Sequence, residues 1–351
     1  MSAGRMIGIG VVLALVLVNA GGAQSVRRRT LPPPVGVLDH HFSFITSIRE
    51  LSDGRVLVTD PREGPVMVAD FASQRVTPVG RIGSGPGEYQ AVTTLTALGG
   101  DSTVMVDLSR RRWTIFALDK VVGTLPPETP IVGRLTEFPF SGSRAGNFLS
   151  RARFLAPTDS TAVILVPWNG SRQDTIVRLA PPLPGHERFP PPFPVQYDGF
   201  AILADGWVVV RRVDPYRVDW RSPTGSWRRG PAIPYPVVPV TDREKAFYLQ
   251  RRSAEGRSPP PGIKLEWPET VPPVEVSSPM LQAPDGTVLV RRYPTADAPG
   301  TTYDVINRQG MREYQLVLPA SERVVGFGSA LVYVTVTDED GLQRLQRHPW
   351  R

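Results

Sequence analysis

Short stretches of alternating apolar and polar residues, separated by tight turns rich in Asp, Gly and Ser, recur along the whole chain. The clearest copy runs from Ile48 to Asp60, where two such stretches flank the turn Ser52-Asp53-Gly54. Valines occupy alternate positions 56 and 58 of the second stretch, which is the period of a half-buried β-strand. Turns at positions 53, 101, 159, 205, 285 and 328 are separated by 48, 58, 46, 80 and 43 residues. Repeated short strands at such intervals predict a radial β-architecture.

The turn spacing predicts an all-β fold, a six-bladed β-propeller of four-stranded antiparallel blades, because propeller blades run about 40–50 residues. In blade three, the turn at Asp159 is expected to precede a second strand at 163–166. The expected strands of blade one are 44–51, 55–60, 66–71 and 76–81. Those of blade five are 275–283, 287–292, 302–307 and 312–318.

The last repeat ends near Trp350 after about three strands, which would leave an unpaired sheet edge. Because a propeller closes its ring to protect such edges, we expect residues 35–41 to supply the missing outer strand. The propeller is therefore predicted to span 35–351.

The long interval before blade five predicts a Pro-rich insertion at 235–274. It contains a helical stretch at 241–252, in which Thr241 and Glu244 have the spacing of a capping box. Two roles are open for the insertion: a functional lid, or a surface excursion that covers a sheet edge.

The N-terminus is typical of an exported protein. Arg5 precedes an apolar run from Met6 to Val18, too short to span a bilayer, and small residues follow up to Ala23. We predict a signal peptide at 1–23, a flexible Pro/Arg-rich leader at 24–34, and a periplasmic or extracellular, secreted protein with no transmembrane segment after cleavage. An uncleaved N-terminal anchor is the alternative. The chain has no cysteine, so packing alone must hold the fold.

The chain is basic, with 40 Lys and Arg against 33 Asp and Glu and a formal charge of +7. One interpretation is an anionic partner, and the other is an arginine-rich composition spread along the chain. Export argues against nucleic acid. The densest basic cluster, Arg27-Arg28-Arg29, lies in the predicted leader.

Residues 81–89 read Arg-Ile-Gly-Ser-Gly-Pro-Gly-Glu-Tyr. This resembles the Gly-x-Gly-Pro-Gly-Glu-aromatic signature of exported bacterial six-bladed β-propeller proteins related to the NHL-repeat group. The phrases at 50–60 and 303–310 are similar to theirs, and the resemblance covers about residues 40 to 350. It implies the fold and transfers no catalytic residue.

In a propeller, the end of each second strand and the connections between blades share one face. This placement predicts a mixed-charge cup formed by Asp60, Glu88, Asp107, Arg212 and Arg292. Such a cup would suit a small anionic or carbohydrate ligand, or a partner protein, with the two arginines as anchors. The structural alternative is that the aspartates cap the turns that follow them, while the arginines pair with carboxylates of neighbouring blades.

Signals for catalysis are few. The four histidines lack metal-ligand spacing, and residues 142–146 form a flexible turn out of register with a Gly-x-Ser-x-Gly elbow. A calcium-dependent hydrolase or lyase acting on a lactone or sugar acid would have only Asp60, Glu88, Asp107 and Asp338 as ligands, beside two arginines. We therefore predict a monomeric binding scaffold without intrinsic catalysis or metal, and we keep the calcium enzyme as the alternative.

Overall fold

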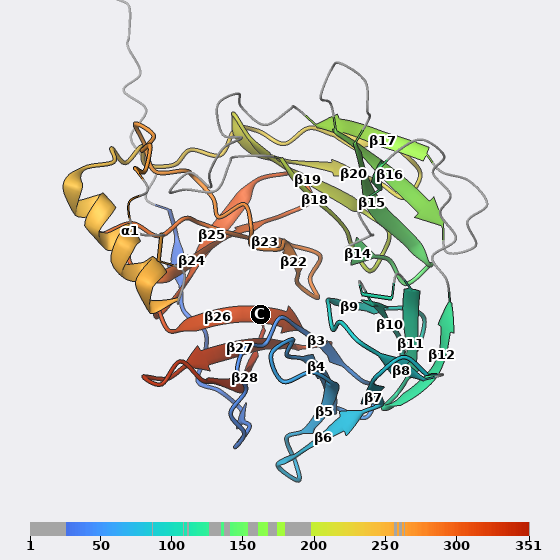
Figure 1. Cartoon of the computed structure of the whole chain (residues 1–351). Coiled ribbons are helices and arrows are strands. Elements are labelled where there is room, and N and C mark those ends of the chain that lie inside the picture. Colours follow the sequence, from blue (N-terminus) through green and yellow to red (C-terminus); the bar gives the residue numbers. More distant parts are fainter. Residues whose placement is uncertain are drawn as a thin grey trace, which may run out of the picture.

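The strands of this protein form small antiparallel sheets arranged radially as a β-propeller that carries a short helix (Figure 1). The structure is a computed structural model that describes residues 26–85, 87–107, 109–110, 112–125, 135–136, 141–153, 161–167, 174–179, 198–255, 258–259, 262 and 264–350. The propeller fold predicted from the turn pattern is thus confirmed. The predicted signal peptide lies outside the described residues. No helix in the described ranges has the length and apolar character needed to cross a membrane.

Consecutive strands pair as antiparallel meanders, and β3, β9, β22 and β26 lie nearest the ring axis (Figure 1). The first sheet contains β3 (Ser47–Glu50), β4 (Val56–Thr59), β5 (Val66–Asp70) and β6 (Arg75–Val79). The second contains β9 (Leu95–Ala97), β10 (Ser102–Asp107), β11 (Arg112–Ala117) and β12 (Lys120–Leu125). Between them, β7 (Arg81–Ile82) and β8 (Glu88–Tyr89) form a small parallel pair.

The next three sheets follow the same plan. The third contains β13 (Leu135–Thr136), β14 (Ser141–Gly142), β15 (Asn147–Arg153), β16 (Thr161–Pro167) and β17 (Asp174–Leu179). The fourth contains β18 (Gly199–Ile202), β19 (Val208–Val213), β20 (Tyr216–Arg221) and β21 (Trp227–Arg228). The fifth contains β22 (Leu281–Gln282), β23 (Val288–Arg291), β24 (Thr301–Ile306) and β25 (Arg312–Leu318). The helix α1 (Asp242–Ala254), the only one in the described ranges, lies between the fourth and fifth sheets in the chain.

The remaining sheet, which we call the closing sheet, joins the two ends of the chain. It contains β26 (Glu322–Phe327), β27 (Leu331–Thr337), β28 (Gln343–Pro349) and β2 (Gly36–Val37). The N-terminal β2 pairs antiparallel with β28, with Gly36 opposite Arg347 and Val37 opposite Gln346. The prediction that residues 35–41 supply the missing outer strand is therefore confirmed.

The leader is ordered where it is described, and the prediction that it is a flexible tail is wrong. Its residues Arg28–Arg29 form β1, which pairs in parallel with β25. Farther along, Leu31 packs against the core between the fifth and closing sheets, and the Pro32 carbonyl contacts His348 Nδ1 at 2.8 Å. These contacts hold the leader against the rim of the ring.

The predicted strand order of the third blade is also wrong. Residues 163–166 belong to β16, which pairs with both β15 and β17 and is therefore the third strand rather than the second. The tight turn before the second strand lies at Ser143–Asn147, where Ser143 N donates to Asn147 O (2.8 Å) and Gly146 has a φ of +78°. Leu51, Leu203 and Ala283 begin the same five-residue hydrogen-bonded turn in other sheets. Residues 142–146, expected to be a flexible turn, are thus the missing member of the repeat.

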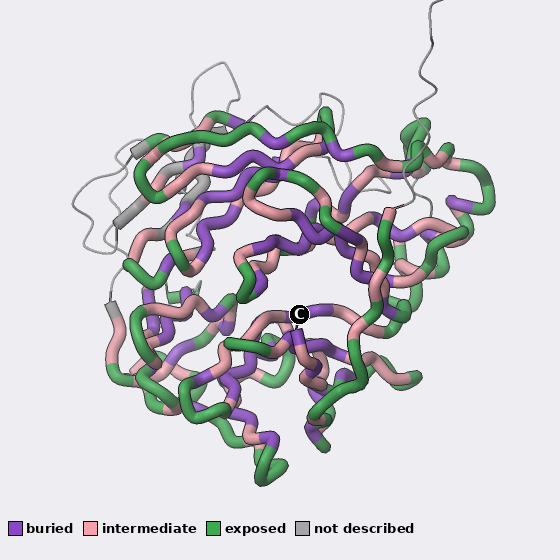
Figure 2. The backbone as a smooth tube through the Cα atoms, turned by 180° about the vertical axis from the view of Figure 1, so that it is seen from behind, coloured by how far each residue is buried: buried purple, intermediate pink, exposed green. Residues whose placement is uncertain are grey.

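The core lies between neighbouring sheets. One cluster joins Val209 and Trp220 of the fourth sheet to Val288 and Val290 of the fifth, all fully or almost fully buried. Figure 2 shows that burial follows the strands, whereas the turns and outer loops are exposed. Each fully buried Val contributes about 1.5–3 kcal/mol relative to an exposed one. Both sides of β23 pack on a neighbouring sheet, because Leu289, between Val288 and Val290, belongs to the core shared with the closing sheet.

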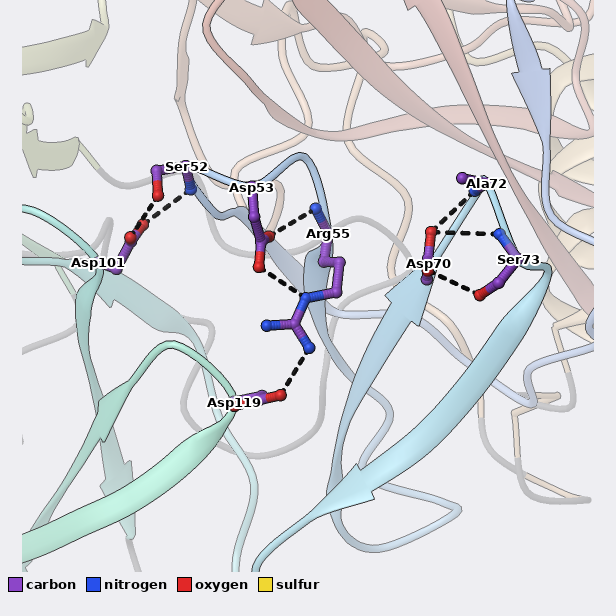
Figure 3. Close-up of polar contacts among 8 residues, drawn as sticks. All are labelled: Ser52, Asp53, Arg55, Asp70, Ala72, Ser73, Asp101 and Asp119. Carbon is purple, nitrogen blue, oxygen red and sulfur yellow. Dashed lines mark hydrogen bonds and ion pairs between the residues drawn. The ribbon is translucent and has the colours of Figure 1, made fainter.

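The tight turns between first and second strands gather on one face of the ring, which we call the turn face. Polar contacts there link neighbouring sheets: the Ser52 N–H and hydroxyl donate to Asp101 at 2.8 and 2.5 Å, and Arg55 bridges Asp53 and Asp119 (Figure 3). A similar link closes the ring, where Ser329 N donates to Glu50 Oε1 at 2.9 Å.

These links predict a pH dependence of stability. Hydrogen bonds from Ser52 lower the pKa of Asp101. Because the folded pKa lies below the unfolded value of about 3.9, this carboxylate stabilises the fold above that value, and the contribution is lost as the pH falls through the folded pKa. Asp101→Asn should therefore lower the urea midpoint at pH 7, and the difference from wild type should shrink below about pH 4. Asp340→Asn, on an exposed turn, is the matched control; a pH-independent difference for Asp101→Asn would contradict the prediction.

Candidate functional site

The loops between second and third strands, the connections between sheets and α1 share the opposite face, which we call the connection face. Two of the predicted site residues lie where a second strand leads into such a loop: Asp60 directly follows β4, and Asp107 ends β10. Both are fully buried. Asp60 accepts hydrogen bonds from the N–H groups of Phe44 (2.6 Å) and Arg62 (2.9 Å). Asp107, the last residue of β10, accepts them from Gln90, Ala91 and Arg110. The structural alternative of capping is thus confirmed for both aspartates.

In the fourth sheet, the charge at this position is reversed. Arg212 occupies the end of the second strand, and Asp198, just before the first strand, accepts from Arg212 Nη1 at 2.6 Å and from Val213 N at 3.1 Å. Arg212 Nε also binds Asp219 at 3.2 Å. Burial alone would lower the pKa of Arg212, but the hydrogen bonds and charges of Asp198 and Asp219 outweigh it and raise this pKa.

Arg292, just after β23 in the fifth sheet, lies over the rings of Tyr216 and Tyr235 at 5.6 and 5.2 Å. Its Nη1 is 3.8 Å from Asp304 Oδ2, and this aspartate is fully buried. Asp304 also accepts from the Tyr216 hydroxyl at 2.9 Å, and burial together with that carboxylate raises the Tyr216 pKa well above its usual value. The arginines therefore do pair with carboxylates, but with those of their own sheets rather than of neighbouring blades.

Glu88 belongs to the loop that carries the Gly-x-Gly-Pro-Gly-Glu-aromatic signature. Its Oε2 accepts from Gly85 N at 2.8 Å, and a Cβ at Gly83 would lie only 2.2 Å from the same oxygen. Gly87 has a φ of +74°, which favours glycine. Tyr89 is fully buried, and its hydroxyl accepts from Val66 N at 2.9 Å. The signature thus has a structural role. Its glycines leave room for the Glu88 carboxylate, and the buried Tyr89 anchors the connection between the first and second sheets.

The five predicted site residues are held separately by their own sheets. In the part of the chain that the structure describes, no hydrogen bond or ion pair joins any two of them. Ligand binding by Asp60, Glu88, Asp107, Arg212 and Arg292 stays a prediction. No group of three or more His, Cys, Asp or Glu side chains within the described ranges could hold a metal ion. Calcium dependence also stays a prediction.

A different set of charged residues comes together on the connection face, and we call Arg251, Arg291, Arg323 and Glu275 the arginine cluster. Glu275 Oε2 lies 3.2 Å from Arg291 Nε, and its Oε1 lies 3.8 Å from Arg251 Nη1. Arg251 comes from α1, Glu275 and Arg291 from the fifth sheet region, and Arg323 from β26 of the closing sheet. Three elements distant in sequence thus converge near one seam of the ring.

The cluster carries an excess of positive charge. A guanidinium stays protonated in proteins, so three cations face one carboxylate. Glu255, which lies 3.8 Å from Arg251, is also 3.7 Å from Arg252 and so adds no net negative charge to the region. Burial lowers the pKa of Arg323, and the nearby charge of Arg291 lowers it further, while Tyr303 and Glu275 oppose these effects. An added anion would relieve this repulsion.

Aromatic rings and backbone carbonyls orient the arginines. Arg323 Nη2 donates to Ile45 O at 2.7 Å and its guanidinium lies 5.3 Å from the centre of the Phe44 ring. Arg251 Nη2 donates to the Tyr293 hydroxyl at 2.6 Å and stacks over that ring at 4.8 Å. Such contacts limit rotamer freedom before any ligand arrives, which lowers the entropic cost of binding.

The helix α1 brings Arg251 to the cluster. Its N-cap is Thr241, whose side chain accepts from Glu244 N at 3.4 Å, as the capping box predicts. The second half of the box is absent, because the buried Glu244 carboxylate instead accepts from Ala296 N at 3.0 Å. This bond fixes α1 to the loop between β23 and β24. Tyr248 packs on Val271 and Tyr293 beneath the helix.

Comparison with known proteins identifies the fold, but it identifies neither a family nor a function. No family model matches the sequence, and no curated protein matches it. A solved structure of a candidate exported protein from Bacteroides fragilis NCTC 9343 has a TM-score of 0.52 and 10% identity, covering 93% of this chain and 99% of that chain. A DUF4221 family member from Bacteroides vulgatus ATCC 8482 has a TM-score of 0.53 and 9% identity, covering 90% and 96%. These two likenesses show a propeller fold.

A candidate gluconolactonase is similar at a lower level, with a TM-score of 0.48, 11% identity and coverage of 91% of this chain and 94% of that chain. The resemblance to NHL-related propellers and the predicted compartment therefore stay predictions.

The sequence did not lead to the arginine cluster, because the site was predicted from the residues on one side of β23 and the cluster lies on the other side. Val288, Val290 and Arg292 share the side of β23 that faces the fourth sheet, and they were the residues considered. Leu289, Arg291 and Tyr293 share the other side. The Arg291-Arg292 dipeptide is a signal that could have directed attention to both sides. Nothing in the sequence places Arg251 of the insertion beside them.

Proposed function

We propose that this propeller is an exported binding scaffold that holds a small anionic ligand, such as a carboxylate-bearing sugar, at the arginine cluster. The observation that carries the proposal is the convergence of Arg251, Arg291 and Arg323 around the single carboxylate of Glu275. Guanidinium groups bind carboxylates through paired hydrogen bonds, and desolvation makes these bonds stronger than in water. The insertion would then act as part of the binding site rather than as a surface excursion.

The same proposal includes a six-bladed ring of NHL type. Five sheets take at least four strands each from one continuous stretch of chain, and the sheet that joins both chain ends would make the sixth blade. This arrangement supports the proposal because it brings β26 and its Arg323 beside the fifth sheet.

The hydrogen bonds that the acidic residues accept favour binding over catalysis on a lactone or sugar acid. A metal-dependent hydrolase or lyase needs several carboxylate oxygens turned toward the metal. Asp60 and Asp107 are fully buried and each accepts at least two backbone N–H groups, and Glu88 accepts one from Gly85. Moving them onto calcium would leave those N–H groups without their partners. We therefore place the calcium-dependent enzyme second.

Titration calorimetry with D-glucuronate at low ionic strength tests the proposal. We expect wild type to bind and Arg291→Gln to bind at least about tenfold more weakly, because a hydrogen bond to a charged group contributes about 1.5–3 kcal/mol. Arg55→Gln, on the turn face, is the matched control and should bind as wild type does. Equal affinity in wild type and Arg291→Gln would refute the site. An increase in melting temperature on adding calcium, lost in Asp107→Ala, would favour the enzyme instead.

A further inference from the structure

We infer a second anion site at the outer rim of the fifth sheet, where Arg28, Arg29 and Thr30 would bind a phosphate-class oxyanion. A depression of about 500 Å³ lies there, lined by these three residues and by Val317 of β25. The site is separate from the arginine cluster and does not depend on the function proposed for it.

The backbone of the leader is fixed in place at this site. Gln315 N donates to Arg27 O at 2.8 Å, and Arg28 and Arg29 lie opposite Gln315 and Leu316 in the parallel pair. Leu31 follows at once and packs into the core between the fifth and closing sheets. Because the chain is held both before and after Arg28 and Arg29, their side chains keep fixed positions along the rim.

The charges at the depression are not balanced by the protein around it. In the ranges that the structure describes, no ion pair joins Arg28 or Arg29 to a carboxylate. The Arg29 guanidinium lies 4.2 Å from the centre of the Tyr314 ring and hydrogen-bonds to the Tyr314 side chain, and these contacts orient the group. Arg28 is exposed. The depression therefore has two positive charges that no described ion pair neutralises.

The chemistry of these groups favours phosphate over a single carboxylate. A phosphate monoester has a charge of about −1.5 to −2 near pH 7 and three acceptor oxygens. Two guanidinium groups and the Thr30 hydroxyl supply a matching charge and a set of donors. Val317 offers an apolar wall to whatever carries the phosphate. The carrier could be a lipid headgroup or a free phosphorylated solute, since both have the same oxyanion.

Titration calorimetry with inorganic phosphate tests the site, carried out in the Arg291→Gln background so that the arginine cluster does not contribute. We expect binding that weakens with added salt and falls at least about tenfold in the double variant Arg28→Gln/Arg29→Gln. Arg27→Gln is the matched control, because Arg27 contributes only its carbonyl to β25 and does not line the depression. Thr30→Val, which keeps both charges, should weaken binding less than the double variant.

The source of the phosphate is distinguished with vesicles. Sedimentation with phosphatidylcholine vesicles that contain phosphatidic acid, reversed by inorganic phosphate, would identify a lipid headgroup. Phosphate binding without sedimentation would identify a free solute. Equal phosphate affinity in the double variant and in Arg27→Gln, with unchanged melting temperatures, would overturn the inference. No phosphate binding by the protein with both arginines intact would overturn it as well.

Discussion

A disulfide between positions 37 and 346 should stabilise the protein more than any other single change that the structure suggests. Val37 of β2 and Gln346 of β28 are register partners in the closing sheet. Leu38 N donates to Leu345 O at 2.9 Å, so the adjacent Val37–Gln346 pair is a non-hydrogen-bonded one. The Cα atoms of such pairs lie about 4.5 Å apart, within the range that a disulfide spans.

The expected gain is large because the bond would close almost the whole chain into one loop. In the chain-entropy model, a loop of about 300 residues gives roughly 6 kcal/mol. Because the chain has no cysteine, Val37→Cys/Gln346→Cys creates the only possible pair. The urea midpoint should rise on oxidation and return on reduction, and each single Cys variant serves as control. Failure of the bond to form in the folded protein would show that the ring does not close in this register.

Removing the carboxylate of Asp304 should be the most damaging single substitution. This fully buried group accepts from the Tyr216 hydroxyl and from Gln315 Nε2, both at 2.9 Å. It also lies 3.4 Å from Arg312 Nη1 and 3.8 Å from Arg292 Nη1. Asp304→Ala would leave two largely buried cations without their counter-ion, and breaking such a pair costs about 3–5 kcal/mol.

The matched control is Asp297→Ala. Asp297 is closer to its arginine, with Oδ1 at 2.6 Å from Arg243 Nη1, but both side chains are mostly exposed. Exposed pairs contribute about 0–1 kcal/mol, so this variant should unfold almost as wild type does. The free energies of unfolding come from urea denaturation at neutral pH. Similar losses for the two variants would show that burial does not govern the strength of these pairs.

The sequence pattern predicted the repeating units of the fold well. Strand alternation and turns placed the first sheet within a few residues, and the unfinished last repeat led to the correct closing strand at 35–41. The third sheet was misassigned because its turn, Ser143–Asn147, lacks the Asp-Gly pair of other turns, so the Asp159-Ser160 pair was taken in its place. Composition alone also failed for the leader, since a Pro/Arg-rich segment can still pair with an open sheet edge.

The candidate site was predicted less well, for a physical reason. Residue type and position at strand ends were sufficient to select Asp60, Asp107, Arg212 and Arg292, but they do not reveal which partner each side chain meets. Those partners, such as Phe44 N for Asp60 and Asp198 for Arg212, are set by tertiary packing. The arginine cluster depends on docking of α1 through Glu244 and Ala296, which no local pattern encodes.

Anion binding at the arginine cluster is tested most directly by a crystal structure of the protein soaked in sodium bromide, with the halide located by its anomalous scattering. Bromide should occupy a position within hydrogen-bonding distance of Arg291 and of Arg251 or Arg323, and the same position should be empty in Arg291→Gln crystals. Guanidinium groups fully enclosed by protein with no bromide beside them, in crystals that bind bromide elsewhere, would contradict the proposed binding site.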